Sequence, residues 1–158
     1  MISFPVNSHR FHYRAAAIVR IDNRLLLHRL EGDEFWALPG GRVHAGELAT
    51  QAIEREFLEE LGSAIACERL LCIGENLFEY NGQPHHEIGL YFAANIPTTS
   101  GLLDHIPVHI GVEGDRRLEF KWFAMTELPG IDMRPEALKQ AIFRDEIPTH
   151  FIQRHNAA

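Results

Sequence analysis

Five glutamates crowd around a single arginine between residues 47 and 60, and three of them could hold a metal ion. Glu56, Glu59 and Glu60 stand at positions i, i+3 and i+4, so on a helix they share one arc of its surface. One arginine cannot offset their mutual repulsion, whereas a hard divalent cation such as Mg²⁺ binds carboxylate oxygens and fills its other positions with water and phosphate oxygens. A solvated helix face is also rich in glutamate, and the spacing of the three residues alone does not separate the two interpretations.

A longer spaced pattern surrounds this cluster. Gly41 is followed after five residues by Glu47, and after seven more residues by REFLEELG, which begins at Arg55. This pattern resembles the signature of the Nudix hydrolases, G-x5-E-x7-R-E-U-x-E-E-x-G-U, where U is a bulky aliphatic or aromatic residue. Every fixed position is present, with Phe57 at the first U, and Ser63 departs only at the last U, a packing position in that family. The flanks FWALPGG and LEFKWF are similar as well, so the resemblance covers nearly the whole chain.

The resemblance implies a reaction and a cofactor. Nudix hydrolases cleave the diphosphate linkage of a nucleoside diphosphate joined to another group, with water attacking phosphorus and Mg²⁺, or Mn²⁺ as a substitute, assisting. We therefore expect a MutT-like pyrophosphohydrolase with a small-molecule nucleotide substrate. The chemistry suits the residues, because metal ions on a carboxylate cluster position the nucleophile and neutralise charge in phosphoryl transfer. The alternative is a Nudix-like sensor that binds a nucleotide without turnover, which has less need of clustered like charges.

The resemblance also assigns roles to individual positions. The metal ligands that it implies are Glu56, Glu59 and Glu60. We take Glu59 as the ligand that also polarises the attacking water. Arg55 and Glu47 are expected to hold each other and to orient the ligand carboxylates. Gly40 and Gly41 would let the backbone bend tightly and approach the metal or the phosphates, since glycine tolerates a positive φ.

Many Nudix enzymes recruit a further glutamate from outside the helix as a general base or an extra ligand. Glu113 is the preferred candidate, because it lies in GVEGD, a flexible-looking stretch before the last predicted strand. Glu119, within that strand, and Glu87 remain open. Glu87 follows His85 and His86, a trio that could suggest a transition-metal site. We disfavour that site, because consecutive strand residues point to opposite faces and leave only two converging ligands.

The elements that must position these residues begin with a hairpin and a helix. Two apolar runs, residues 14–21 and 24–29, flank the turn pair Asp22-Asn23, and a long loop with at most a short strand near 36–38 follows. Apolar residues at four-residue steps then predict an amphipathic helix from Leu48 to Leu61, ended by a left-handed cap at Gly62.

Further strands and a second helix complete the expected fold. Two strand-like runs flank the turn pair Asn81-Gly82, a loop spans about residues 97–116, LEFKWFAM alternates as a strand, and RPEALKQAIF predicts a helix with Pro135 in its first turn. This order points to an α+β domain, and the resemblance to an α/β/α sandwich with a central mixed β-sheet. We expect one domain over residues 1–158 with a core of about 10–145.

Composition excludes several classes of protein. The net charge of −7 argues against nucleic acid as a partner. No apolar run approaches the roughly 20 residues that span a bilayer, and the first residues lack the apolar segment of a secretory signal, so a cytoplasmic location is expected. Cys67 and Cys72 should point to opposite faces of a strand and stay free thiols. Because Nudix proteins are often dimers, a homodimer is a further expectation.

The sequence leaves the leaving group of the substrate open. Tyr80 lies 17 residues past Ser63, where some Nudix enzymes that act on dinucleoside polyphosphates carry a tyrosine. Many ADP-ribose hydrolases have a proline near that spacing, and here the next proline is Pro84. Trp36, Phe78 or Tyr80 could stack on a nucleobase, although each could equally pack in the core.

Overall fold

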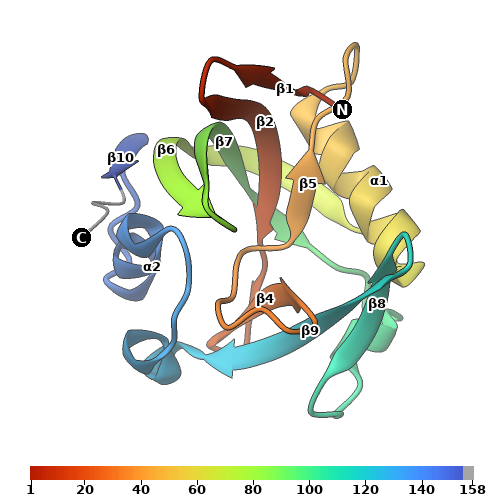
Figure 1. The fold of residues 1–158 in the computed structure, drawn as a ribbon. Coiled ribbons are helices and arrows are strands. Elements are labelled where there is room, and N and C mark those ends of the chain that lie inside the picture. The colour runs from red at the N-terminus through yellow and green to blue at the C-terminus, as the bar shows by residue number, and fades with distance from the viewer. Residues whose placement is uncertain (155–158) are drawn as a thin grey trace.

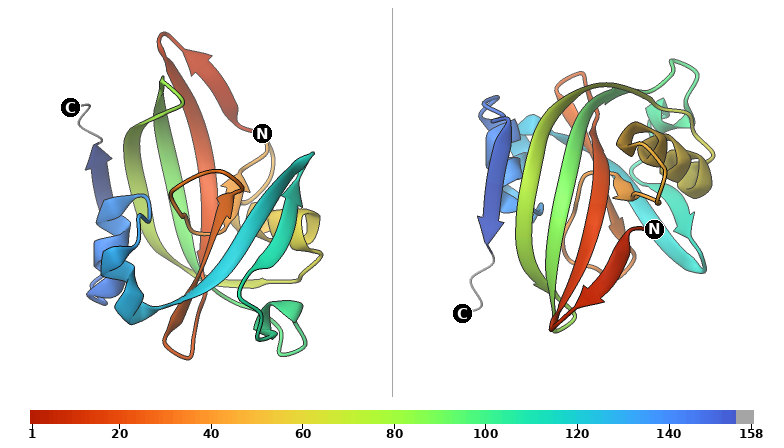
Figure 2. Two further views of the ribbon diagram at one scale, coloured as in Figure 1. Left: turned by 60° about the horizontal axis from the view of Figure 1, so that its bottom comes forward. Right: turned by 90° about the horizontal axis from the view of Figure 1, so that it is seen from above.

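The computed structural model describes residues 1–154 and places two β-sheets between two helices (Figure 1). Helix α1 (Ala49–Leu61) and helix α2 (Glu136–Phe143) lie on opposite sides of the strands, as the two further views in Figure 2 also show. The last four residues of the expected domain, 155–158, lie outside the described range.

The larger sheet is the central mixed sheet that the sequence predicts. Its main path runs in the order β1 (Ser3–Val6), β2 (His9–Ile18), β7 (Gln83–Asn95), β6 (Ala66–Tyr80) and β10 (His150–Arg154), and β5 (Gly40–Arg42) also pairs with β2. Strands β2 and β7 are parallel, as are β6 and β10, and the remaining pairs are antiparallel. Strands β1 and β10 extend the sheet beyond the expected core of residues 10–145.

A second, antiparallel sheet of four strands was not expected from the sequence. Its order is β3 (Arg20–Ile21), β4 (Arg24–Leu30), β9 (Arg116–Ala124) and β8 (His109–Glu113). The predicted hairpin around Asp22-Asn23 is present, and both turn residues have positive φ. Its first arm is only two residues long, however, because the apolar run before it belongs to β2 and pairs with β7 in the mixed sheet.

Alternation along β2 divides the interior into two cores. Ala15 and Ala17 pack on the side of α1, and Ala16 and Ile18 pack on the side of α2. This is the two-residue period of a strand whose faces are both covered. The cysteines follow the same rule, because Cys67 packs against the α1 core and Cys72 lies in the α2 core. Both thiols are free, as expected.

The predicted central helix is confirmed almost to the residue. Helix α1 begins at Ala49 and buries Ile53 and Phe57, which recur at four-residue steps. Gly62 ends it with φ 65°, and its backbone N–H donates to the Leu58 carbonyl oxygen at 3.0 Å. A glycine takes this left-handed conformation without a Cβ penalty.

Two predicted boundaries were wrong. The loop expected over residues 97–116 contains a short 3-10 helix, Gly101–Leu103, and strand β8, so Glu113 ends a strand rather than lying in a loop. The sequence HIGVE conceals this strand because its buried face carries His109 and Gly111, whereas the apolar Ile110 and Val112 are exposed. The second helix starts one residue after Pro135, which precedes its first turn instead of occupying it.

Within residues 1–154, none of the helices combines the length and the apolar character that crossing a membrane requires.

Candidate active site

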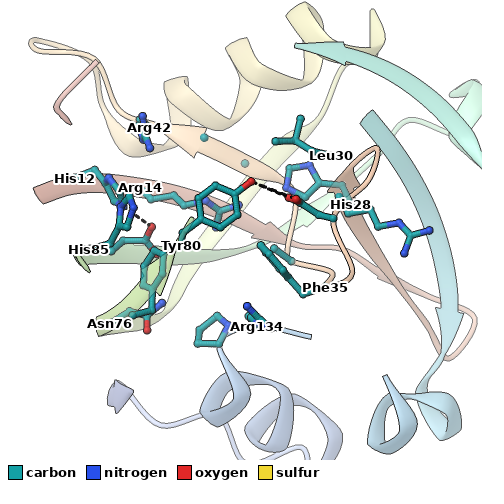
Figure 3. A pocket seen from close by; sticks show the side chains of 18 of the residues that line it. His12, Arg14, His28, Leu30, Phe35, Arg42, Asn76, Tyr80, His85 and Arg134 are labelled. Carbon is teal, nitrogen blue, oxygen red and sulfur yellow. Dashed lines mark hydrogen bonds and ion pairs between the residues drawn. The ribbon is translucent and has the colours of Figure 1, made fainter. Parts of the chain in front are cut away.

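A pocket of about 730 Å³ opens where the mixed sheet extends past the α2 core (Figure 3). Along β2, the side chains on this face change from the buried Ala16 to Arg14 and His12, and along β7 they change from Tyr91 to Glu87. The loop before β5 and the N-terminal end of α2 supply further walls. The pocket therefore combines a polar sheet surface with residues from loops.

Three carboxyl groups meet at one end of this pocket, which we call the acidic end. Glu56 and Glu60 come from α1 and Glu113 from β8. Strand β8 approaches α1 closely at Gly111, which has no side chain. A Cβ at this position would lie only 2.9 Å from the Glu60 carbonyl oxygen. Burial, reinforced by the neighbouring charges of Glu56 and Glu113, raises the pKa of Glu60. Such crowding is relieved when a divalent cation binds.

Gly41 brings strand β5 against this end. A Cβ on Gly41 would overlap the Glu56 carboxylate, and a Cβ on Gly40 would overlap the backbone of Ala15. Neither glycine has a positive φ, so the tight bend that was expected there is absent. Glycine is required at both positions because a side chain would overlap a neighbouring segment. The side-chain oxygens gathered at the acidic end belong to carboxyl groups, the ligands that suit Mg²⁺ or Mn²⁺.

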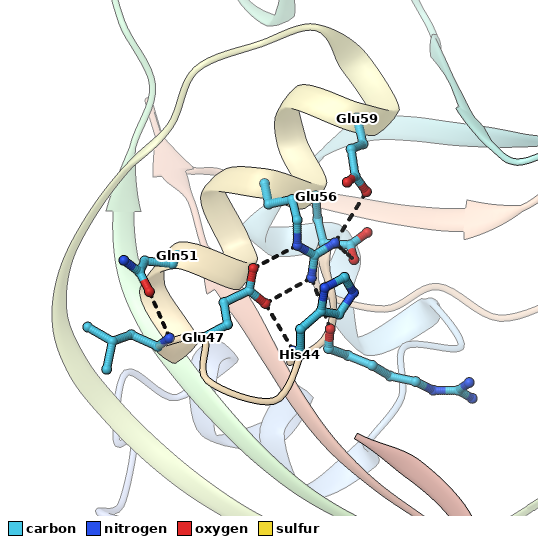
Figure 4. Close-up of polar contacts among 8 residues, drawn as sticks. His44, Glu47, Gln51, Glu56 and Glu59 are labelled. Atoms are coloured by element: carbon cyan, nitrogen blue, oxygen red, sulfur yellow. Dashed lines mark hydrogen bonds and ion pairs between the residues drawn. The ribbon is translucent and has the colours of Figure 1, made fainter. Parts of the chain in front are cut away.

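Arg55 connects the acidic end to the start of the helix (Figure 4). Its Nε and Nη2 donate to the two carboxylate oxygens of Glu47 at 2.7 and 3.0 Å. Its Nη1 donates to Glu56 at 2.8 Å and to Glu59 at 3.2 Å, and Nη2 also donates to the Arg42 carbonyl oxygen at 3.1 Å. All five guanidinium N–H groups are therefore used. The hydrogen bonds from Arg55 lower the pKa of Glu47 to about 2.

Glu59 lies apart from the other two predicted ligands. Its side chain is 59% exposed, its carboxylate is paired with Arg55, and it does not line the pocket. Among residues 1–154, no group of three or more carboxylate, histidine or cysteine side chains is arranged so that it could hold a metal ion. The structure brings Glu56, Glu60 and Glu113 to the same end of the pocket without closing them into a complete metal site, and it leaves Glu59 at the edge.

The three candidates for a distal glutamate differ in place. Glu113 belongs to the acidic end, and its charge contributes to the raised pKa of Glu60. Glu119 pairs with Arg29 at 3.2 Å and does not line the pocket. Glu87 lines the pocket but is buried, with its Oε2 3.4 Å from His12 Nε2. Burial raises the pKa of Glu87.

Of the three aromatic residues that could stack on a nucleobase, one lies in the core and two line the pocket. Trp36 is buried in the α2 core, with its ring 5.0 Å from that of Phe123, and does not line the pocket. Phe78 and Tyr80 line the pocket. The Tyr80 hydroxyl donates to both carboxylate oxygens of Asp33 at 3.2 Å, which fixes its ring at the pocket rim.

Several pocket residues were not anticipated from the sequence. They include His12, Arg14, His28, Asn76, Phe35 and Arg134. Arg134 lies over the Phe35 ring at 4.3 Å, although about a hundred residues separate the two in the chain. The alternation of His12 and Arg14 in HRFHYR was a usable signal, because residues two apart share a strand face. Nothing in the sequence indicated that Phe35 meets Arg134.

A buried histidine in this pocket should make the protein sensitive to mild acid. Burial lowers the pKa of His28 from 6.5 to about 3. Between these values the unfolded chain binds a proton that the folded chain does not, so the free energy of unfolding falls as the pH decreases. From about pH 6.5 to about pH 5 this single group contributes a loss of about 2 kcal/mol.

Denaturant titrations across that pH range should show a shallower acid loss for His28→Leu than for the parent chain. The exposed His105 provides the matched control, because His105→Leu should retain the full slope. An unchanged slope in His28→Leu would contradict this origin of the acid sensitivity.

Comparison with known proteins places the chain among Nudix domains. The sequence model of the NUDIX domain matches residues 11–144. An RNA pyrophosphohydrolase of Sodalis glossinidius is 36% identical over 63 residues, which are 40% of this chain and 36% of that protein. The chain thus aligns with little more than a third of that relative.

Solved structures give the same result over most of the chain. A MutT NUDIX hydrolase from Burkholderia pseudomallei is 29% identical, with a TM-score of 0.57, and the match covers 82% of this chain and 95% of that one. A MutT protein from Methanosarcina mazei is 19% identical, with a TM-score of 0.62 and coverage of 90% and 98%. The expected fold, α+β with a mixed sheet and helices, is confirmed.

Proposed function

The chain belongs to the Nudix family, and on that premise we propose that it is a divalent-metal-dependent pyrophosphohydrolase acting on a nucleoside diphosphate joined to another group. The observation that carries the proposal is the meeting of Glu56, Glu60 and Glu113 at one end of a pocket large enough for a nucleotide. Crowded carboxyl groups are costly unless a cation or a proton offsets them. A site for phosphoryl transfer from a nucleotide would bind such a cation, which accounts for the crowding of the carboxyl groups.

We assign each residue of the site a role in this reaction. Glu56 and Glu60, with Glu59 at the edge, would provide the oxygen ligands for Mg²⁺ or Mn²⁺. Arg55, itself paired with Glu47, holds Glu56 and Glu59 in orientation. Bound metal supplies Lewis-acid charge neutralisation on the phosphate oxygens and lowers the pKa of water. Glu113 would accept the proton of the attacking water, and its exposure together with the effect of its charge on Glu60 supports this role.

Arginines in the pocket support a polyanionic substrate. The residues concerned are Arg14, Arg29, Arg42, Arg116 and Arg134. The chain carries a net charge of −7, so their concentration on one pocket is not a general basic surface. Guanidinium groups bind phosphate oxygens in pairs of parallel hydrogen bonds, which both orients a diphosphate and balances its charge.

The test is hydrolysis of a substrate panel. Nucleoside triphosphates, dinucleoside polyphosphates, ADP-ribose, nucleotide sugars and NADH would each be incubated with the chain, with and without Mg²⁺ or Mn²⁺, and the products separated by chromatography. We expect metal-dependent cleavage of at least one class. Tight metal-dependent binding of a nucleotide without cleavage of any member would contradict an enzymatic role and favour a sensor.

A pair of variants tests the distal glutamate. Glu113→Gln is expected to lower kcat about a hundredfold, because general-base catalysis contributes roughly that factor or more. Asp115→Asn is the matched control two residues further along the chain, since Asp115 is exposed and does not line the pocket, and it should retain near-parental kcat. Equal losses in both variants, measured on the best substrate of the panel, would contradict the role of Glu113.

A further inference from the structure

Four side chains form a polar surface on the sheet side of the pocket, which we call the polar floor. His12 lies on β2, His85 and Glu87 lie on β7, and Asn76 lies on β6. Glu87 stands in register between His12 and Asn76 on the two neighbouring strands. The residues are only 3%, 6%, 7% and 8% exposed for His12, His85, Glu87 and Asn76 respectively, yet all four line the pocket.

Three polar atoms of this floor are buried and have no hydrogen-bond partner. They are Nδ1 of His12, Nδ1 of His85 and Oδ1 of Asn76. A buried polar atom without a partner costs roughly 1–3 kcal/mol, and native proteins rarely leave even one in place. Three on one wall of a single pocket are a set of hydrogen-bonding positions that a bound group would satisfy.

Burial also disfavours charge on the polar floor. Burial lowers the pKa of His12 to about 3 and lowers that of His85, while burial raises the pKa of Glu87. Phosphate groups are attracted to guanidinium groups and gain little from neutral imidazoles. The floor therefore suits a neutral group that offers several hydrogen-bond donors and acceptors.

Flat rings accompany these polar atoms. The His85 ring stacks on Phe78, with centroids 5.0 Å apart and planes within 6°, and it also lies 5.0 Å from His12. Tyr80 meets His85 edge-on at 6.3 Å and Phe35 at 6.0 Å, so the rings continue to the pocket rim. Figure 3 shows His12, His85 and Asn76 on one side of the pocket, with Tyr80 and Phe35 leading away from them. Flat aromatic surfaces favour a flat aromatic ligand.

Two arginines connect the polar floor to the acidic end. Arg14 follows His12 on the same face of β2 and pairs in register with Arg42 on β5, and Arg42 follows Gly41, which lies against the Glu56 carboxylate. The charge of Arg42 interacts with Glu87 of the floor and with Glu113 of the acidic end. The charge of Arg14 likewise acts on both Glu87 and Glu60. The pocket thus presents a neutral aromatic surface, then guanidinium groups, then carboxylates. A nucleotide has the same order, because its flat neutral base is joined through a sugar to its phosphates.

We propose that His12, Asn76, His85 and Glu87 form the subsite that selects the nucleobase of the substrate, through hydrogen bonds to its edge. This inference rests on the proposed function, since it places the phosphates of the substrate at the acidic end. Discrimination between bases then depends on the floor, whereas the leaving group is free to contact the loops at the rim.

The inference is tested by binding rather than by turnover. Calorimetry on the full chain in Mg²⁺ buffer would compare four nucleoside 5′-monophosphates with ribose 5-phosphate, none of which contains a diphosphate linkage. We expect at least one monophosphate to bind about tenfold or more tightly than ribose 5-phosphate, as a few buried hydrogen bonds and ring contacts provide. His85→Phe and Asn76→Leu should each reduce that advantage about tenfold and leave ribose 5-phosphate affinity unchanged.

A matched control lies one residue away. His86 sits on the opposite face of β7 with its ring 5.6 Å from Phe11 and does not line the pocket, so His86→Phe should bind all ligands as the parent does. Thermal unfolding would verify that each variant is folded, and Asn76→Leu decides the question if His85→Phe is not. Equal binding of all five ligands, or an equal loss for ribose 5-phosphate in the variants, would overturn the inference.

The outcome for the subsite is separable from that for the reaction. Base-selective binding without hydrolysis of any panel substrate would support the subsite and contradict the enzymatic role. Hydrolysis of a panel substrate by a chain that binds all five ligands equally would support the enzymatic role and contradict the subsite.

Discussion

Replacing Glu60 with glutamine is expected to lower turnover on the order of a thousandfold while the chain remains folded. Glu60 is buried at the acidic end between Glu56 and Glu113, so an amide there removes a charged oxygen ligand from the least exposed position of the site. The amide has nearly the same shape as the carboxyl group and carries no charge to repel its neighbours, so the fold loses no packing.

The matched control for this variant is on the same helix. Glu54 is exposed and does not line the pocket, so Glu54→Gln should hydrolyse the best panel substrate at the parental rate. Circular dichroism and the melting temperature would establish that both variants are folded. Near-full activity of Glu60→Gln in saturating Mg²⁺ would show that Glu60 is not a required ligand.

Replacing Arg55 is expected to affect activity and stability together. Lysine keeps a positive charge but lacks the planar fork that donates to both oxygens of Glu47 and reaches Glu56 at the same time. Loss of such an orienting group typically lowers metal affinity or activity 10- to 100-fold, so Arg55→Lys should lower kcat/KM by about that factor.

The alanine variant removes the charge as well as the geometry of the guanidinium group. Arg55→Ala leaves the mostly buried carboxylate of Glu47 without its partner, and the melting temperature should fall on the order of 5 °C. Arg117, which forms a long ion pair with Glu31 on the exposed surface, is the control, and Arg117→Ala should shift neither activity nor melting temperature measurably. A lysine variant with parental kcat/KM would contradict the orienting role of Arg55.

The residue types alone did not predict which aromatic side chains line the pocket, because this depends on the tertiary structure. Trp36 was as good a stacking candidate as Tyr80 by residue type, yet it is buried against Phe123 while Tyr80 lines the pocket. The difference arises because the loop around Trp36 packs against the α2 core, and no local pattern specifies that contact.

The sequence by itself determined the parts of this protein that are local. Helix α1 with its Gly62 cap, the turn at Asn81-Gly82 and the free cysteines on opposite strand faces all follow from periodicity and residue type, which act within a few residues. The spaced signature around Arg55 was equally readable, because Glu47, Arg55 and Glu56 lie close in the chain and one helix holds two of them.

Only the tertiary structure decided how distant segments meet. Strand β8 carries Glu113 to the same end of the pocket as Glu60, because Gly111 allows the strand to approach α1. The polar floor combines three strands whose register is set by long-range pairing, so His12, Asn76 and His85 could not be grouped beforehand. Local patterns specify elements and their faces, whereas sheet order and strand register, which depend on the whole core, place side chains from distant segments in one pocket.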